Sequence, residues 1–482
     1  RKSIVSTLAG QLNDSNFYPM NRRKFLKTTT TAVAGGALTG SLPAQQNKPN
    51  EKQPNILFIM TDQQHAGMMS CTGNPWLKTP ALDELAAGGI RYQKAYASNP
   101  VCVPSRMGMA TGMMPARLGA LDNGGTKVKR LPPEASRYSM GKLMKEASYD
   151  TFYGGKVHMS PELTPSKESG YDEYFRDQRE NLPQATVKFL SKKRKNPFFA
   201  VASFINPHDI CYAYNAYKKR EKMMPGVNKL YEEAAKIPTN DLPPLPDNFE
   251  IPKLEPDAVK ANGKTTAVTP SKTMRAEYDE REWRIYRWIY CRLTEEVDGH
   301  IGQILDGLKK SGQEDNTLAV FISDHGDMDS SHGLASKGVM YEESANVPLI
   351  IRYPNSIKSG GVSKQLVNIG IDLLPTFCDY AEIKAPSHLL GESLRTMDNL
   401  RPYVASENHW SRMIRTSRYK YCAYKEGELR ESLVDLENDP GEMKNLALDK
   451  RYQAALDHHR QYLKDWVKLS ADEHGKEYLI PA

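Results

Sequence analysis

Four short apolar runs, separated by segments with helical periodicity, constrain the fold of this 482-residue chain more than any other feature. They are Asn55–Met60, Phe198–Phe204, Leu318–Ser323 and Val347–Arg352. Runs of this length that are apolar throughout predict strands buried on both faces. Because such strands alternate with helices, we expect an α/β fold with a mostly parallel central sheet and helices on both faces.

Helical patterns fill the stretches between these runs. We expect helices over Thr79–Gly88, where Pro80 suits the first turn, over Ser139–Ala147 and over Glu277–Lys310. The last has one apolar face, formed by Ile285, Ile289, Leu293, Val297, Ile301, Leu305 and Leu308. Residues 212–275 are rich in Lys, Pro and Tyr and weakly periodic, so we expect a long surface excursion there, as a lid or a wall of the substrate site.

Polar side chains follow three of the predicted strands, at the point where each strand ends. Asp62 follows the first, His208 follows the second, and Asp324 and His325 follow the third. In parallel sheets the carboxyl ends of the strands meet at one edge, where such folds build their sites. We therefore expect these four side chains to lie close together.

The pattern changes near residue 395, which predicts a second, smaller unit. We expect a catalytic domain over residues 50–394 and a C-terminal α+β subdomain over 395–482. In the subdomain, Arg412–Tyr424 and Ser432–Leu436 predict an antiparallel sheet, and Tyr452–Leu469 predicts a final amphipathic helix.

The first 46 residues predict an export signal rather than part of the fold. A basic stretch that contains Arg22 and Arg23 precedes a mildly apolar run of small residues, as in a twin-arginine signal read by export machinery. Met20 is a candidate translation start. We expect an exported protein, periplasmic or extracellular, and no later run is long and apolar enough to predict a membrane span.

Charge and cysteine content argue against two other classes of protein, nucleic-acid-binding proteins and disulfide-stabilised domains. The chain carries +7, of which residues 1–46 hold +5 (six basic residues and one acid), so about +2 remains. Nucleic-acid binding gains no support from that balance. The six cysteines show no CxxC pair and no zinc-ligand spacing, and a disulfide scaffold is not expected in a domain this large.

One short motif carries specific chemistry. Cys102-Val103-Pro104-Ser105-Arg106, followed by Thr111-Gly112, resembles the C-x-P-S-R signature of the formylglycine-dependent type I sulfatases, which belong to the alkaline-phosphatase-like superfamily. The resemblance implies that Cys102 is oxidised to formylglycine by a formylglycine-generating or sulfatase-maturing enzyme. A buried structural cysteine beside a proline turn is the alternative.

Further matches in the order of that family make chance a poor explanation, and they cover nearly all the chain after the signal. They are Asn55–Gln63, which ends in Asp62-Gln63 where many sulfatases have two Asp; Gly154–His158; Phe204–His208; Ser323–Asp327 with Lys337 downstream; and Ser432–Glu442.

A sulfate monoester is an anion, so its hydrolysis needs a cation that neutralises the sulfate oxygens. Oxygen ligands select calcium or magnesium, and the resemblance favours calcium. It implies a metal site formed by Asp62, Gln63, Cys102, Asp324 and His325. Gln63 supplies a neutral carbonyl oxygen in place of a carboxylate, and an imidazole at position 325 suits softer metals better.

The resemblance also implies catalytic roles. The hydrated aldehyde at Cys102 attacks sulfur with one hydroxyl, and deprotonation of the other expels sulfate. Arg106 steadies the hydrate, His208 protonates the leaving alcohol and His158 assists elimination of sulfate. Two lysines, Lys156 and Lys337, bind sulfate oxygens, although an isolated lysine is more often a solvated surface residue.

Three further residues are candidate contacts to the leaving group. They are Asn123, soon after the nucleophile helix, and His409 with Arg412 in the C-terminal subdomain. A loop after an apolar strand forms a plausible pocket edge, and an exposed polar turn is the equal alternative.

Together these patterns predict an enzyme that hydrolyses sulfate monoesters, on a sulfated glycan or oligosaccharide. A phosphate or phosphonate ester hydrolase of the same superfamily would use a similar metal site. A non-catalytic binder of sulfated glycans would keep the pocket without the modified cysteine.

Overall fold

The computed structural model describes residues 53–213, 224–261, 274–395 and 401–481. The expected export signal, residues 1–46, lies outside the described residues. Residues 52–482 form one compact unit. Among the helices that are described, none combines the length and the apolar character needed to cross a membrane.

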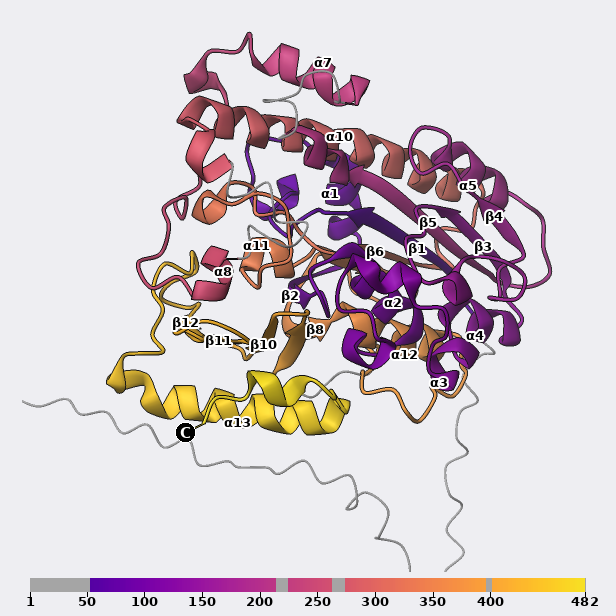
Figure 1. Ribbon diagram of the computed structural model, residues 1–482. Coiled ribbons are helices and arrows are strands. Elements are labelled where there is room, and N and C mark those ends of the chain that lie inside the picture. The colour runs from indigo at the N-terminus through magenta and orange to yellow at the C-terminus, as the bar shows by residue number, and fades with distance from the viewer. Residues whose placement is uncertain (1–52, 214–223, 262–273, 396–400, 482) are drawn as a thin grey trace, which may run out of the picture. The chain divides into compact units, whose positions relative to one another are not determined.

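The central sheet is mostly parallel, as predicted (Figure 1). Within the described ranges it has eight strands in the order β4-β3-β5-β1-β6-β7-β2-β8. The strands are β1 (Asn55–Asp62), β2 (Ile90–Tyr96), β3 (Asp150–Gly155), β4 (Glu173–Phe175), β5 (Phe198–Pro207), β6 (Thr317–Ser323), β7 (Leu349–Arg352) and β8 (Gly361–Asn368). Of these described strands only β7 runs antiparallel to its neighbours.

All four predicted strands are present, and one of them, β7, runs in the opposite direction to its neighbours. Between the end of β6 and the start of β7 the chain forms the loop that carries Lys337 and the four-residue helix α11 (Glu342–Ala345). Strand β7 then pairs antiparallel with both of its neighbours, β6 and β2. Strands β2 and β8 carry many polar residues and are partly exposed, which is why no apolar run predicted them.

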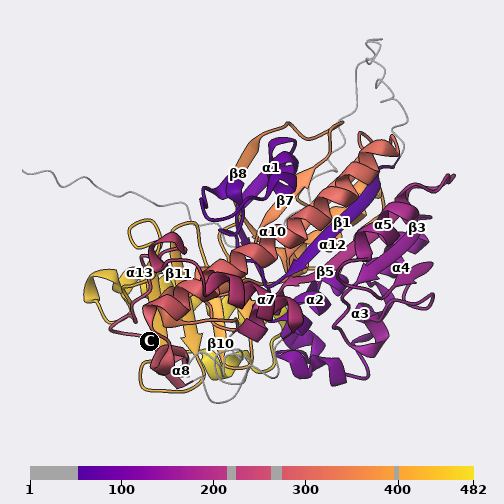
Figure 2. The same ribbon diagram turned by 90° about the horizontal axis from the view of Figure 1, so that it is seen from above.

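Helices cover both faces of the sheet, as expected (Figures 1 and 2). Alternate residues of β1 point to opposite sides: Phe58 packs in one apolar cluster and Ile59 in the other. The helices on the Phe58 side are α2 (Cys102–Thr111), α4 (Met140–Glu146) and α12 (Ile369–Tyr380). Those on the Ile59 side are α1 (Pro80–Ala87), α5 (Leu182–Leu190) and α10 (Glu280–Lys310).

The long helix α10 begins three residues later than predicted because Asp279 forms its N-terminal cap. The Asp279 carboxylate accepts a hydrogen bond from the backbone N–H of Glu282, whose side chain accepts one from the N–H of Asp279. This capping box satisfies two amides that would otherwise lack partners. Further along α10, Asp298 accepts hydrogen bonds from the first amides of α1, which is a structural contact.

The expected surface excursion has more structure than its weak periodicity indicates. Its described part contains α7 (Pro225–Ala234) and α8 (Asp257–Ala261). Arginines of α10 hold it: Arg281 donates to the carbonyl of Ile237, and Arg284 donates to that of Leu242. Carbonyl groups leave no periodic pattern in a sequence, so these contacts were not predictable.

The predicted C-terminal antiparallel sheet is present, with strand order β12-β11-β10-β9 among the described residues. Its strands are β9 (Val404–Glu407), β10 (Ser411–Arg415), β11 (Tyr419–Tyr424) and β12 (Glu431–Asp435). Helix α13 (Gln453–Ser470) packs against one face through Leu463 and Trp466. The described residues also include a short helix, α3 (Pro133–Arg137).

All six cysteines lie within the described residues and are free, in agreement with the expectation that the fold has no disulfide scaffold.

Candidate active site

The carboxyl ends of the strands converge as predicted. Asp62 is the last residue of β1, and Asp324 follows β6, the strand that pairs in parallel with β1. His208 follows β5, which pairs with β1 on the other side. Cys102 is the first residue of α2. Neighbouring strand ends and the start of one helix therefore place these side chains at one edge of the sheet.

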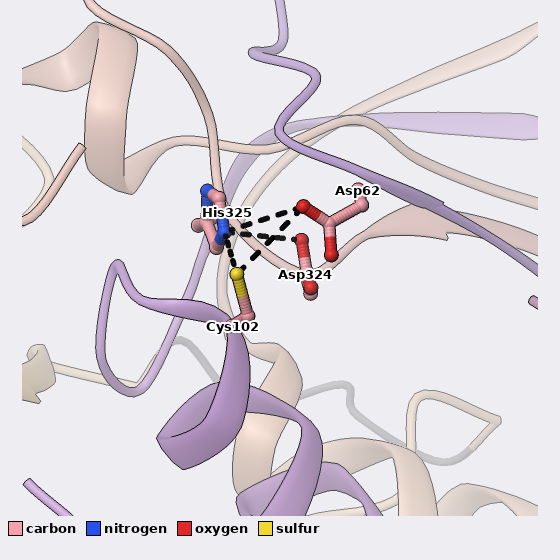
Figure 3. A group of neighbouring side chains, drawn as sticks. All are labelled: Asp62, Cys102, Asp324 and His325. Atoms are coloured by element: carbon pink, nitrogen blue, oxygen red, sulfur yellow. Dashed lines mark hydrogen bonds and ion pairs between the residues drawn. The ribbon is translucent and has the colours of Figure 1, made fainter. Parts of the chain in front are cut away.

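Four buried side chains meet there (Figure 3). The ligand atoms of Asp62, Cys102, Asp324 and His325 all lie within 4.8 Å of one another. The Nε2 atom of His325 is 3.5 Å from Asp324 Oδ1, 3.7 Å from Asp62 Oδ1 and 3.2 Å from Cys102 Sγ. Two buried carboxylates need cationic partners, and oxygen donors at this spacing suit a divalent hard cation.

Arg106 orients both carboxylates. Its Nη2 donates to Asp62 Oδ2 at 2.9 Å and its Nε to Asp324 Oδ2 at 2.6 Å, while Nη1 donates to the hydroxyl of Ser203 at 2.8 Å. The Oδ1 atoms of the two carboxylates are the ones that face His325. Burial lowers the pKa of Arg106, but Asp324 and Asp62 outweigh it and raise that pKa above its ordinary value.

Two buried lysines complete the cationic environment. Lys156 Nζ lies 2.7 Å from Asp62 Oδ2. Lys337, which is 2% exposed, places Nζ 3.2 Å from Cys102 Sγ and 2.5 Å from Gln63 Oε1. The alternative of a solvated surface lysine at position 337 is therefore wrong. Burial and Asp62 raise the pKa of the Cys102 thiol, yet the two lysines and His325 outweigh them and hold it well below its usual range.

Gln63 lies beside the cluster in a left-handed backbone conformation, with φ of 67°. Its backbone N–H donates to Asp324 Oδ1 at 3.2 Å, and its Nε2 donates to Asp327 Oδ2 at 2.6 Å. Its Oε1 accepts from Lys337 and from the Cys211 thiol at 3.2 Å. The Gln63 side chain is thus oriented with Oε1 toward Lys337. That Gln63 binds a metal ion stays a prediction.

Both predicted catalytic histidines have a buried nitrogen free for another partner. Among the described residues, neither His158 Nδ1 nor His208 Nδ1 has a hydrogen-bond partner. Burial and Lys337 lower the pKa of His208, but Cys211 and Asp62 outweigh them and raise it to about 9. His158 has a positive φ of 47°, a strained conformation of the kind that clusters at functional sites.

The three expected leaving-group contacts differ in placement. Asn123 Oδ1 accepts from the N–H of Val103, one residue from the nucleophile position. His409 is partly buried, and this burial lowers its pKa despite the opposite effect of Asp122.

Arg412 is 1% exposed, and two of its guanidinium nitrogens are paired inside the C-terminal subdomain: Nε donates to Asp472 at 2.7 Å and Nη1 donates to the carbonyl of Asn408. These contacts give Arg412 a structural task, and its expected contact with substrate stays a prediction.

The sequence alone indicated no role for four residues that lie near the site. Ser203 and Asp327 lie inside or beside matched motifs, and Cys211 follows His208 by three residues. The fourth, Asn408, belongs to the loop proposed as a pocket edge. Position within a motif could have indicated Asp327, but only the tertiary structure shows what each of them contacts.

Two histidines that belong to no motif stack on aromatic rings, and four such methionines are buried in apolar clusters. His332 stacks on Tyr341 with ring centroids 3.9 Å apart, and His300 stacks on Phe204. The pairs Met68-Met69 and Met113-Met114 are buried in apolar clusters, as expected for packing residues.

A mostly parallel sheet with paired carboxylates, an imidazole and a cysteine at its carboxyl edge, surrounded by buried cations, defines a hydrolase of anionic esters. A family model described as Sulfatase matches residues 54–383, and one described as N-sulphoglucosamine sulphohydrolase, C-terminal, matches residues 330–468. The chain belongs to the sulfatase family and is a sulfuric ester hydrolase of the type I, alkaline-phosphatase-like kind.

Relatives of known name span nearly the same length. The chain is 31% identical to a Delta 4,5-hexuronate-2-O-sulfatase of Bacteroides thetaiotaomicron, over 91% of this chain and 93% of that protein. It is 26% identical to an N-acetylglucosamine-6-O-sulfatase of the same organism, over 93% and 92%. The solved structure of a 2-O GAG sulfatase matches with a TM-score of 0.75 and 29% identity, over 88% of this chain and 94% of that chain.

Proposed function

We propose that this sulfatase hydrolyses sulfate monoesters on sulfated saccharides, with a formylglycine made from Cys102 and a bound Ca²⁺ ion. The observation that carries the proposal is the position of Cys102. Its Sγ lies 3.2 Å from both Lys337 Nζ and His325 Nε2 and 3.8 Å from Asp62 Oδ1. The residue that matches the modified cysteine therefore adjoins both the cation-binding group and a sulfate-binding lysine.

The surroundings of Cys102 suit its conversion into the nucleophile. A hydrated formylglycine supplies one hydroxyl that can attack sulfur and a second whose deprotonation releases sulfate. The thiol is 1% exposed and begins a helix. We therefore expect a maturing enzyme to act before the chain has folded around it.

The donors in the cluster fit a divalent cation. When bound, Ca²⁺ would neutralise sulfate oxygens and polarise the S–O bonds. Asp62 and Asp324 would each present Oδ1, with Gln63 Oε1 as a neutral ligand nearby. His325 Nδ1 lies 2.9 Å from the Gly326 carbonyl, which only accepts, so Nδ1 carries a proton and Nε2 is the ring nitrogen that would bind the cation.

The remaining residues bind the substrate and move protons. Lys156 and Lys337 would neutralise sulfate oxygens, and both ammonium groups already lie within the cluster. His208 would donate a proton to the oxygen of the departing alcohol, and His158 would accept one from the second hydroxyl at position 102. The buried, unengaged Nδ1 atoms of the two histidines support these roles.

The substrate class rests on the relatives. A hexuronate 2-O-sulfatase and an N-acetylglucosamine 6-O-sulfatase both act on sulfated sugars, so a sulfated saccharide is the favoured substrate here. The basic, apolar N-terminal pattern supports export to the periplasm or the extracellular space, where such saccharides would be met.

A desulfation screen of matured protein on defined sulfated saccharides tests the proposal. Aryl sulfate and aryl phosphate serve as a matched pair of simple substrates. We expect release of sulfate from at least one saccharide and faster turnover of the aryl sulfate. Faster turnover of the phosphate would instead favour a phosphate or phosphonate hydrolase. An intact Cys102 thiol in protein from the native host, shown by mass spectrometry, would favour a non-catalytic binder.

A further inference from the structure

The loop that carries Lys337 has a left-handed backbone on both sides of the lysine. Ser336 has a φ of 68° and Gly338 a φ of 95°. Glycine adopts this region without steric cost, but serine rarely does, so the strain lies at Ser336. Such a conformation persists only when the surrounding structure holds it.

Hydrogen bonds hold both residues that flank the lysine. The Ser336 N–H donates to Asp327 Oδ2 at 3.1 Å, and the Gly338 N–H donates to Ser344 Oγ at 3.1 Å. The Gly338 carbonyl accepts from Asn408 Nδ2 at 2.9 Å. The first two partners lie nearby in the same stretch of chain, whereas Asn408 comes from the C-terminal sheet.

Asn408 lies in the turn between β9 and β10, is 1% exposed, and is fixed in one orientation. Its Oδ1 accepts from the N–H groups of Trp410 and Ser411 and from the Ser411 hydroxyl, at 2.7–3.0 Å. Its own carbonyl accepts from Arg412. Because donors surround Oδ1, the NH₂ group must be the part that faces Gly338.

We infer that Asn408 is a positioning residue for Lys337, so that the C-terminal sheet sets where the lysine ammonium meets the sulfate group. The inference rests on the proposed role of Lys337 in binding sulfate. Gly338 directly follows the lysine, and the hydrogen bond from Asn408 to its carbonyl fixes the peptide between Gly338 and Val339, one residue beyond the lysine. The ammonium now lies 3.2 Å from Cys102 Sγ, and a misplacement of about 1 Å can lower a rate by about 10²-fold.

Asn408→Asp tests this with little change of shape. The variant keeps the acceptor for the turn but places an oxygen against the Gly338 carbonyl. We expect kcat/KM on an aryl sulfate to fall roughly 10- to 100-fold, and affinity for inorganic sulfate, measured by calorimetry with calcium present, to fall roughly 10-fold. Ser411→Ala is the control. It removes one hydrogen bond to Asn408 Oδ1 but leaves the bond to Gly338, so both values should stay within about threefold of the unaltered protein.

A double-variant cycle separates positioning from general structural support. In a Lys337→Met background there is no ammonium to position, so Asn408→Asp should lower sulfate affinity by less than about twofold further. An equal loss in both backgrounds overturns the inference, as does unchanged sulfate affinity in a folded Asn408→Asp protein. If that variant does not fold, Asn408→Ala replaces it in the same double-variant cycle. Failure of both variants to fold also overturns the inference. Lys337→Met alone reports on the proposed function: unaltered sulfate affinity there would refute the role of the lysine itself.

Discussion

Arg106 and Asp62 form a buried ion pair in which the Nη2 atom of the arginine takes one carboxylate oxygen, Oδ2, at 2.9 Å. The other oxygen, Oδ1, faces His325 and Cys102 at 3.7 and 3.8 Å. The arginine therefore does two things at once. It neutralises a carboxylate that has no contact with water, and it decides which oxygen is presented to a cation.

Arg106→Met should be strongly destabilising. It leaves Asp62 and Asp324 buried without their guanidinium, and breaking a buried pair in this way costs about 3–5 kcal/mol. Urea denaturation would measure the free energy of unfolding, and activity should be lost as well. Arg137→Met, at an exposed arginine, is the matched control and should change the free energy by less than about 0.5 kcal/mol. Equal stabilities of the two variants would show that the buried pair does not hold the site together.

Cys102→Ser and Cys102→Ala should abolish turnover while the fold survives. A serine can attack sulfur but has no second hydroxyl with which to release the product, and an alanine cannot attack. We expect kcat on an aryl sulfate to fall by about 10⁴-fold or more. Circular dichroism and the thermal midpoint should stay close to those of the parent, because both substitutions are small. Substantial activity in either variant would overturn the role proposed for position 102.

Removal of divalent ions should stop the reaction. A chelator should lower kcat by roughly 10²-fold or more, with recovery on addition of Ca²⁺ and less on addition of Mg²⁺. Calcium should also raise the thermal midpoint, since an ion that binds only the folded state stabilises it. Asp324→Asn provides the matched test, because it should weaken this stabilisation by calcium. Full activity after exhaustive chelation would exclude a dissociable ion.

Stability should fall in acid partly through His459. This ring is 4% exposed; burial lowers its pKa to about 4, and its Nδ1 donates to the Ala455 carbonyl. The unfolded histidine has a pKa of about 6.5, so the unfolded chain binds the proton first as the pH falls. The stabilisation is therefore complete above about pH 6.5 and is lost toward pH 4, by about 3 kcal/mol in total.

His459→Gln should flatten this dependence of unfolding free energy on pH. The neighbouring His458 is exposed, so His458→Gln is the matched control and should change the slope much less than His459→Gln does. Denaturant titrations at pH 7, 5.5 and 4 would measure both. An unchanged slope in the His459 variant would show that its ring is not what titrates.

Much of the fold could be predicted because burial leaves a pattern. The runs that became β1, β5 and β6 are apolar throughout because both of their faces are covered. The direction of β7 was not predictable, because it depends on how the intervening loop returns. Strand β8 lies at the sheet edge, and its first residues are largely exposed, so its sequence resembles a loop.

The sequence by itself determined the chemical types at the site and their approximate meeting place. Motif order and strand ends are local properties, so they were enough to assign Asp62, Cys102 and Asp324 to one edge of a sheet. Only the tertiary structure decided which carboxylate oxygen faces inward, that Lys337 is buried, and that Asn408 reaches the carbonyl of the residue after this lysine. Asn408 and Gly338 are 70 residues apart, and nothing in either stretch encodes that contact. It arises when two sheets pack, because hydrogen-bond geometry depends on the positions of both partners at once.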